Sequence, residues 1–236
     1  MEAIENRKQI LENKKENLNN RMIKFLFEGA PVRGACVQMA EEWQEMIKFH
    51  HYPENVAALL GQFTAGALLL SSTIKFEGSL ILQVKGSGPI AFIYAEVRNP
   101  MSVRAMAEIR EGAEIKPEMD LQELINKDGK GLCALILDPK DRRPGVQPYQ
   151  GMVSLESNSV AENLENYMAK SEQLETKLYL AADSKKLGGL VIQKMPSVGG
   201  NVSEISDPDA WGRILQLAHT VTKDELLNVP ATDVLH

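Results

Sequence analysis

The sequence predicts an α+β fold, in which an antiparallel β-sheet platform is covered by helices and followed by a small helical subdomain. Three features support this prediction. Short runs rich in β-branched and aromatic residues alternate with loops that contain glycine or proline. One run of twenty residues, 55–74, carries no charge and is long enough for a central helix. Beyond residue 206, helix-start signals follow one another closely.

The composition changes divide the chain into three expected parts. Residues 1–21 are polar and charged, which predicts an N-terminal extension and provides no apolar run for a secretory signal. Residues 22–196 hold the alternating apolar runs and form the expected α+β core. The segment SVGGNVSEISDP is typical of a linker, and residues 197–236 are therefore expected to form a separate helical subdomain.

The uncharged run 55–74 has to be weighed as a membrane span, because twenty apolar residues can cross a bilayer. Gln62, Thr64, two serines and two glycines dilute its hydrophobicity. Pro53 lies just before the run, where proline suits the first turn of a helix. We therefore expect a helix buried in a globular core, and no membrane partner.

The segment Gly86-Ser87-Gly88 resembles a phosphate-binding loop, but its surroundings predict a turn. A phosphate loop opens a helix, whereas Pro89 and the strand-like run IAFIYAEV follow here. We expect a hairpin whose two glycines adopt positive φ. The sequence also contains no G-x-x-x-x-G-K-[ST] motif, so ATP-driven work has no support.

Further strands and helices are expected along the rest of the chain. GLCALIL, GMVSLE, KLYLAA and GGLVIQKMP are strand-like, and Ser159 with Glu162 has the spacing of a capping box. Asp207-Pro208 is expected to start a helix, and Thr222 with Glu225 a second one. A third would begin near Thr232, so the stop at His236 suggests a chain cut within an element.

Charge and cysteine content narrow the function classes. The formal charge of −6 provides no basic patch for phosphate contacts, so nucleic acid is not an expected partner. Cys36 and Cys133 lie far apart without a CxxC pair, which gives no metal site and no dithiol centre. We expect no cofactor in this chain, and a reducing cytoplasm as its location.

Two alternatives from other classes remain open on the residues alone. Ser72-Thr73-Ile74-Lys75 matches S-x-x-K, so a small-molecule serine hydrolase could use Ser72 and Lys75. The end of a helix offers carbonyls rather than N–H groups to an oxyanion, and S-D-N and K-T-G partners are missing. A thiol redox protein would need Cys36 and Cys133 with Cα atoms less than about 7 Å apart.

The pattern as a whole resembles the heat shock protein 33 family of redox-regulated bacterial chaperones, from about Met22 to the last residue. The resemblance rests on FLFEGAPVRGACVQM, STIKFEGSLILQVKGSGPI, YMAKSEQLETKLYLAA and ELLNVPATDVLH. It implies a cytoplasmic holding chaperone that binds unfolded or misfolded proteins without ATP during oxidative and heat stress, and it implies no enzyme activity. In that family a four-cysteine zinc module follows, and its four cysteines are missing here. The resemblance therefore implies a chain that is active constitutively, under reducing and oxidising conditions alike.

The resemblance also directs attention to the apolar strand 90–97, both of whose faces are apolar. If helices cover one side, the other is an apolar patch suited to unfolded chains. We expect Ile81, Ala91, Ile93 and Val97 to bind clients, with a purely structural core as the alternative. In the preceding strand, Ile81 and its neighbours at 83 and 85 predict a mixed, half-exposed face.

A homodimer is the expected assembly, because the resemblance implies one. Trp211, Ile214 and Leu215 also carry more apolar surface than a short appendage can bury against itself. We expect the C-terminal helices to be exchanged between the two subunits.

Overall fold

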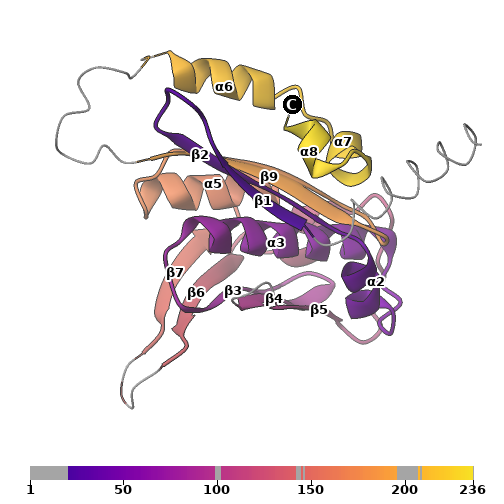
Figure 1. Ribbon diagram of the computed structural model, residues 1–236. Coiled ribbons are helices and arrows are strands. Elements are labelled where there is room, and N and C mark those ends of the chain that lie inside the picture. The colour runs from indigo at the N-terminus through magenta and orange to yellow at the C-terminus, as the bar shows by residue number, and fades with distance from the viewer. Residues whose placement is uncertain are drawn as a thin grey trace, which may run out of the picture.

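The computed structural model describes residues 21–98, 102–141, 145, 147–195, 207 and 209–235 (Figure 1). Two antiparallel sheets lie on opposite sides of one long helix, and further helices lie around them (Figure 1). The α+β prediction is confirmed. The expected extension 1–21 lies outside the described residues apart from Arg21, which begins the first strand.

The four-stranded sheet has the order β1-β2-β9-β8 and is antiparallel throughout. It joins the two ends of the core, since the early hairpin of β1 (Arg21–Leu26) and β2 (Val32–Met39) meets the late hairpin of β8 (Thr176–Ala182) and β9 (Leu187–Lys194) through the pairing of β2 with β9. The segment recognised as KLYLAA is β8, and GGLVIQKMP supplies most of β9.

The five-stranded sheet has the order β5-β4-β3-β6-β7 and is also antiparallel. Its strands are β3 (Gly78–Lys85), β4 (Ile90–Arg98), β5 (Ser102–Ile109), β6 (Leu132–Pro139) and β7 (Tyr149–Ser154). The expected hairpin of β3 and β4 and the strands β6 and β7 are confirmed. The edge strand β5 is an addition to the sequence-based expectation.

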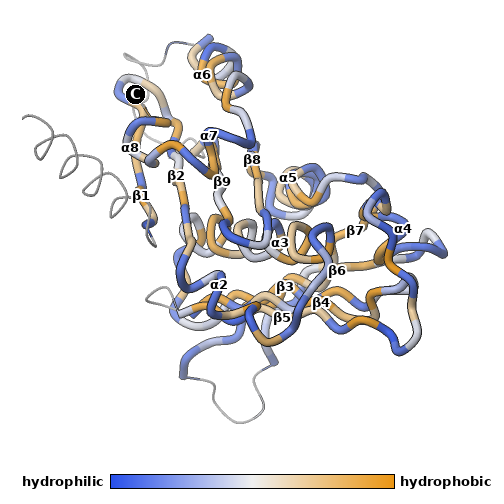
Figure 2. The backbone as a smooth tube through the Cα atoms, turned by 90° about the vertical axis from the view of Figure 1, so that its right-hand side faces the viewer, coloured by the Kyte–Doolittle hydropathy of each residue, from blue (hydrophilic) through white to orange (hydrophobic). Residues whose placement is uncertain are grey.

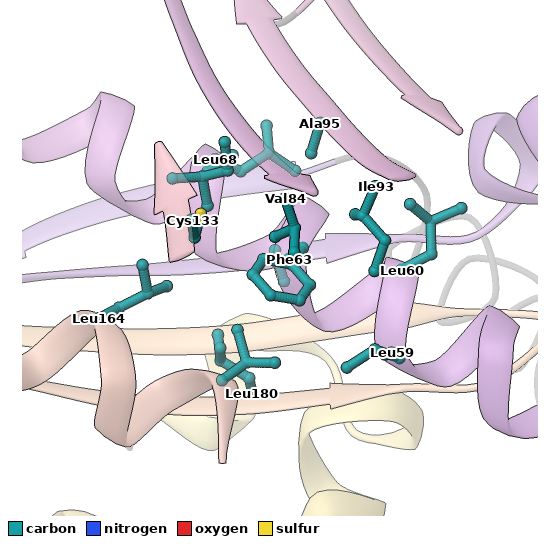
Figure 3. Packing of buried hydrophobic residues seen from close by; sticks show 14 of the residues in the cluster. Leu59, Leu60, Phe63, Leu68, Val84, Ile93, Ala95, Cys133, Leu164 and Leu180 are labelled. Carbon is teal, nitrogen blue, oxygen red and sulfur yellow. The ribbon is translucent and has the colours of Figure 1, made fainter. Parts of the chain in front are cut away.

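Helix α3 (Glu54–Thr73) fills the space between the sheets and explains the uncharged run. By length and composition it could cross a membrane, yet 78% of its most apolar window is buried inside the protein. Leu60, Phe63 and Leu68 are all at most 1% exposed, and Figure 3 shows how they meet side chains from the strands and from α5. The prediction of a central core helix is confirmed.

Three shorter helices close the core around α3. In α2 (Glu41–Ile47), Trp43 is fully buried and its Nε1 donates to the carbonyl of Asp183 at 2.8 Å. The others are α4 (Leu121–Ile125) and α5 (Val160–Lys170). The capping box expected before α5 forms only in part. The hydroxyl of Ser159 accepts from the Glu162 amide, while the Glu162 carboxylate bonds to Ser157 instead.

Helices α6 (Ala210–Ala218), α7 (Lys223–Asn228) and α8 (Ala231–Val234) lie on the face of the four-stranded sheet that points away from α3 (Figure 1). The capping box predicted for α7 is confirmed, with Thr222 and Glu225 bonded reciprocally. The expected domain boundary after residue 196 lies outside the described residues, so the division of the chain into these domains stays a prediction.

The turn between β3 and β4 corrects one expectation. Gly86 and Gly88 do not adopt positive φ, which occurs at other glycines such as Gly78 and Gly129. The glycines are required by crowding instead. A Cβ on Gly86 would lie 2.0 Å from the Ile90 carbonyl oxygen, and one on Gly88 would lie 2.5 Å from the carbonyls at the end of α4. The turn is therefore tightened by close packing within the hairpin and against α4, and it needs no ligand.

Candidate functional site

The five-stranded sheet has a covered face and an open face, and the alternation along β3 distinguishes them. Leu80 and Leu82 point toward α3 and are 2% and 0% exposed. Between them Ile81 is half-buried, as is Gln83, while Lys85 at the strand end is exposed. The mixed, half-exposed face predicted for this strand is therefore confirmed. No described helix lies across it (Figures 1 and 2).

Strand register aligns the outward side chains in rows across the sheet. Tyr94 pairs with Met106 on one side and with Gln83 on the other. Gln83 pairs with Ala134, which in turn pairs with Met152. The neighbouring rows are built in the same way. We call this surface the open face, and its apolar and amide members are Ile81, Gln83, Phe92, Tyr94, Met106, Leu132, Ala134, Ile136, Gln150 and Met152.

The open face exposes several large apolar side chains close together, and such exposed apolar patches mark interaction sites. Met106, Leu132 and Met152 are 39%, 45% and 48% exposed. Phe92 and Tyr94 are half-buried and stack with ring centroids 6.3 Å apart. Flexible thioethers beside flat aromatic rings can adapt to many apolar side chains, so this arrangement suits contact with varied unfolded segments.

One end of the open face is charged. Glu96 is only 4% exposed, and Arg98 donates from Nε to its carboxylate at 2.7 Å. Burial alone would raise the pKa of Glu96, but hydrogen bonds from Arg98, Ser79 and Tyr94 and the charge of Arg98 outweigh burial and lower it. An open depression of about 680 Å³ adjoins this end, and its lining includes Ser79, Arg98 and Lys140.

At the β5 edge of this sheet, one tyrosine occupies a pair of backbone groups. The hydroxyl of Tyr52 donates to the carbonyl of Ala107 at 2.9 Å and accepts from the amide of the same residue at 3.0 Å. Ala107 belongs to β5, the edge strand beside β4. A side chain thereby satisfies a backbone donor and acceptor that another strand could otherwise pair with.

The four residues expected to bind clients do not share one face. Ile93 and Val97 point into the core at 1% and 4% exposure, so a client cannot reach them in this conformation. Ala91 is half-buried at a register shift between Ile90 and Phe92. Of the four, Ile81 lies on the open face. Client binding by these residues stays a prediction.

The sequence-based choice overlooked the aromatic and methionine side chains of the open face. Phe92 and Tyr94 alternate with Ile93, but both faces of β4 are apolar, so alternation cannot show which face is open. The polar residues of the neighbouring strand carried a usable signal. Gln83 and Lys85 mark the open face of β3, and they pair with Tyr94 and Phe92.

A second apolar sheet face is covered by the C-terminal helices. Outward side chains of the four-stranded sheet meet these helices in one buried cluster, formed by Val32, Cys36, Ala181, Leu190, Ile192, Ile214, Ala218, Leu226 and Ala231. Gln38 holds the C-terminal helices against this face, because its Nε2 donates to the carbonyls of Leu226 at 3.0 Å and Val229 at 2.6 Å. Its Oε1 accepts from the amide of Ala231 at 2.9 Å.

The geometry does not support the alternative built on Ser72 and Lys75. The hydroxyl of Ser72 donates to the carbonyl of Leu69 at 2.6 Å within its own helix, a bond that serine commonly makes in helices. Lys75 is exposed to solvent beyond the helix end. The serine proton is thus engaged by the backbone, and the hydroxyl lies among helix-terminal carbonyls that would repel an oxyanion.

The two cysteines are free, and they lie in different environments. Cys36 is buried beneath the C-terminal helices, whereas Cys133 lies in the core between α3 and the five-stranded sheet (Figure 3). Burial raises the pKa of each thiol to about 12. Neither thiol is poised for redox chemistry, because the reactive species is the thiolate. The alternative of a thiol redox protein therefore loses its chemical basis.

A metal site also finds no ligand set in the part of the chain that the structure describes. Within it, no three His, Cys, Asp or Glu side chains lie together in a way that could hold a metal ion. The zinc implied by the resemblance for longer family members would need ligands other than these residues.

Comparison with known proteins agrees with this architecture. The family model described as "Hsp33 protein" matches residues 20–236. The "33 kDa chaperonin" of Methylobacillus flagellatus is 36% identical over 219 residues, which cover 92% of this chain and 70% of that protein. The "33 kDa chaperonin" of Nitrosococcus oceani is 40% identical over 221 residues, covering 93% of this chain and 71% of that protein.

A solved structure shares the fold. The crystal structure of the 33 kDa chaperonin (heat shock protein 33 homolog) from Thermotoga maritima superposes with a TM-score of 0.70 at 20% identity. The match covers 91% of this chain and 73% of that one.

Proposed function

Since this chain belongs to the Hsp33 family and is a chaperone rather than an enzyme, we propose that it is a holding chaperone that binds unfolded polypeptides without ATP. The observation that carries the proposal is the open face, where apolar side chains of all five strands remain accessible. An extended client segment would lie across these rows and bury its own apolar side chains against them. This interaction needs surface contact alone, in agreement with a sequence that lacks a phosphate-binding motif.

The proposal includes activity that is independent of thiol chemistry. Cys36 and Cys133 are buried with raised pKa values, so neither is suited to sense an oxidant while the fold is intact. We expect client holding in the reduced protein without prior oxidation. We place the protein in the cytoplasm and expect no nucleic acid partner, in agreement with two unpaired thiols and the net charge of −6.

The proposal is tested by removing apolar surface from the open face. We expect Phe92→Ser combined with Leu132→Ser to reduce suppression of client aggregation several-fold, because both side chains lie outward on the open face. A matched control is Phe49→Ser with Leu26→Ser. These two residues are 79% and 70% exposed but lie away from the open face. The measurement is light scattering of a heat-denatured reporter enzyme, with and without ATP.

The same assay checks the role of the thiols. Dithiothreitol and the thiol-selective oxidant diamide should give equal protection, and Cys36→Ser with Cys133→Ser should leave protection nearly unchanged. Equal loss in the open-face pair and the control pair, with both proteins folded by circular dichroism, would reject the open face as the client site.

A further inference from the structure

The open face carries thioethers at both of its edges. Met106 on β5 and Met152 on β7 terminate the row that crosses the sheet through Tyr94 and Ala134. Their exposures of 39% and 48% make them the exposed methionines among the described residues. The amide Nε2 of Gln150 approaches the Met152 sulfur at 3.7 Å, so this sulfur lies at the solvent side of the strand.

Other methionines of the same chain are protected and provide an internal comparison. Met39 in β2 is 3% exposed and Met168 in α5 is 1% exposed. Both belong to the main core cluster around α3. Oxidation of a thioether requires contact between the sulfur and the oxidant, so these two should react only when the protein opens.

We propose that Met106 and Met152 are oxidation sites that tune the open face, an inference that rests on the function proposed above. A hydroperoxide transfers one oxygen atom to the thioether sulfur, which becomes a sulfoxide. The sulfur loses two electrons, the O–O bond breaks, and hydrogen peroxide is reduced to water. The buried thiols Cys36 and Cys133 are protected in the same folded protein.

Oxidation would change the chemistry of the surface at its margins. A sulfoxide is polar and strongly hydrated, so it would replace adaptable apolar contact at β5 and β7 by a hydrogen-bond acceptor. The apolar surface would then narrow to the central strands, where Phe92, Tyr94, Ile81 and Ile136 remain. We expect weaker client holding, with no change in the fold, because neither sulfur is part of the core.

The first experiment maps oxidation on the whole folded chain. The protein is treated with hydrogen peroxide at increasing times, quenched, digested and analysed by mass spectrometry for the gain of one oxygen. We expect sulfoxide at Met106 and Met152 well before Met39 and Met168. Equal rates at all four positions would overturn the assignment of these two residues as oxidation sites.

The second experiment connects the modification to client holding. Peroxide treatment should lower aggregation suppression several-fold in the unmodified sequence, and methionine sulfoxide reductase should restore it. The variant Met106→Leu with Met152→Leu keeps apolar surface of similar size but has no thioether at these positions, so peroxide should lower its client holding much less, relative to its own untreated level, than it lowers that of the parent. A double leucine variant that loses activity to peroxide as the parent does would overturn the regulatory role.

These outcomes separate the inference from the function on which it rests. If the Phe92 and Leu132 substitutions leave client holding intact while sulfoxide still forms at Met106 and Met152, the open face is not the client site and only the oxidation sites stand. If the substitutions abolish holding but peroxide has no effect on it, the client site stands and the oxidative tuning is wrong. Equal client holding under reducing and oxidising conditions is therefore expected for thiol-selective oxidants alone, because peroxide would also oxidise Met106 and Met152.

Discussion

Glu96 is an unusual residue for a surface that otherwise exposes apolar side chains, because its carboxylate is almost completely buried there. Its pKa in the folded protein lies below the ordinary value of 4.5, since the hydrogen bonds and the charge of Arg98 outweigh burial. A carboxyl group with a lowered pKa adds stability above its unfolded pKa. That contribution is lost as the pH falls through the folded value.

We therefore predict that Glu96→Gln destabilises the protein by about 1–2 kcal/mol at neutral pH, because Gln keeps the shape of the side chain but not its charge. The difference from the parent should shrink as the pH falls below 4.5, where the unfolded chain begins to bind a proton at this residue, and should disappear once the pH is below the lowered pKa of the folded state. Urea unfolding at both pH values measures the difference. Glu108→Gln, on the same face but exposed, is the control. A difference that is independent of pH would contradict the electrostatic account.

At the scale of elements, the contact between β2 and the helices α7 and α8 depends on one amide side chain. Gln38 is 3% exposed and makes three hydrogen bonds to backbone groups of the two helices. Its removal leaves these buried groups without their partner, a loss of roughly 1–3 kcal/mol for each unsatisfied group. The loss of free energy should weaken the docking of the helices and leave the sheet intact, because the strand pairing of β2 does not involve the Gln38 side chain.

Gln38→Ala should consequently increase the rate at which Cys36 reacts with a maleimide, because this thiol lies beneath the helices. Cys133 serves as the internal reference, since it is packed against α3 and should stay protected. Peptide mass spectrometry after timed labelling measures both sites. Gln44→Ala, which removes an exposed amide bonded to the Lys185 carbonyl, should leave both rates unchanged. Labelling of Cys36 at the parent rate in Gln38→Ala would show that other contacts hold the cover.

Helices and strands that are indicated by their own residues could be predicted from the sequence. Features that depend on contacts with other elements of the fold could not. Helix α3 followed from an uncharged run behind a proline, and α7 from the capping box at Thr222. Strand β5 was missed because Arg104 and Glu108 alternate with small and apolar residues on an edge. The open face depends on which side of the five-stranded sheet α3 occupies, and no pattern within β4 contains that information. Gly88 is likewise required by its close contact with α4, an element distant in the sequence.

At the scale of the whole molecule, the packing of helix α6 determines which of its apolar side chains remain exposed for a dimer contact. Ile214 is buried within the chain at 8% exposure, and Trp211 and Leu215 are half-buried, so these residues do not form a bare apolar surface. Leu217 on α6 is 70% exposed and is the apolar side chain of this helix that remains free for a partner. A second copy that exchanges the C-terminal helices would cover it.

We predict that the chain is a homodimer at micromolar concentration and that Leu217→Asp shifts it toward the monomer, because a charge would then be buried at the contact. Sedimentation equilibrium should give twice the monomer mass of 26.1 kDa for the parent. Phe49→Asp, at another exposed aromatic position, should leave the dimer intact. A parent that sediments as a monomer would refute both the dimer and the exchange of helices.

The hydrogen bonds of the Tyr52 hydroxyl to both backbone groups of Ala107 bear on whether the protein aggregates with copies of itself. A sheet with an exposed apolar face and an edge strand of unpaired backbone groups is a template on which identical chains can stack into fibrils. Here a side chain from the loop before α3 occupies one donor and one acceptor of the edge strand β5, while the surface beside it stays open. The molecule can therefore offer its open face to foreign chains while its β5 edge is less available for pairing with copies of itself, which favours capture over polymerisation at that edge.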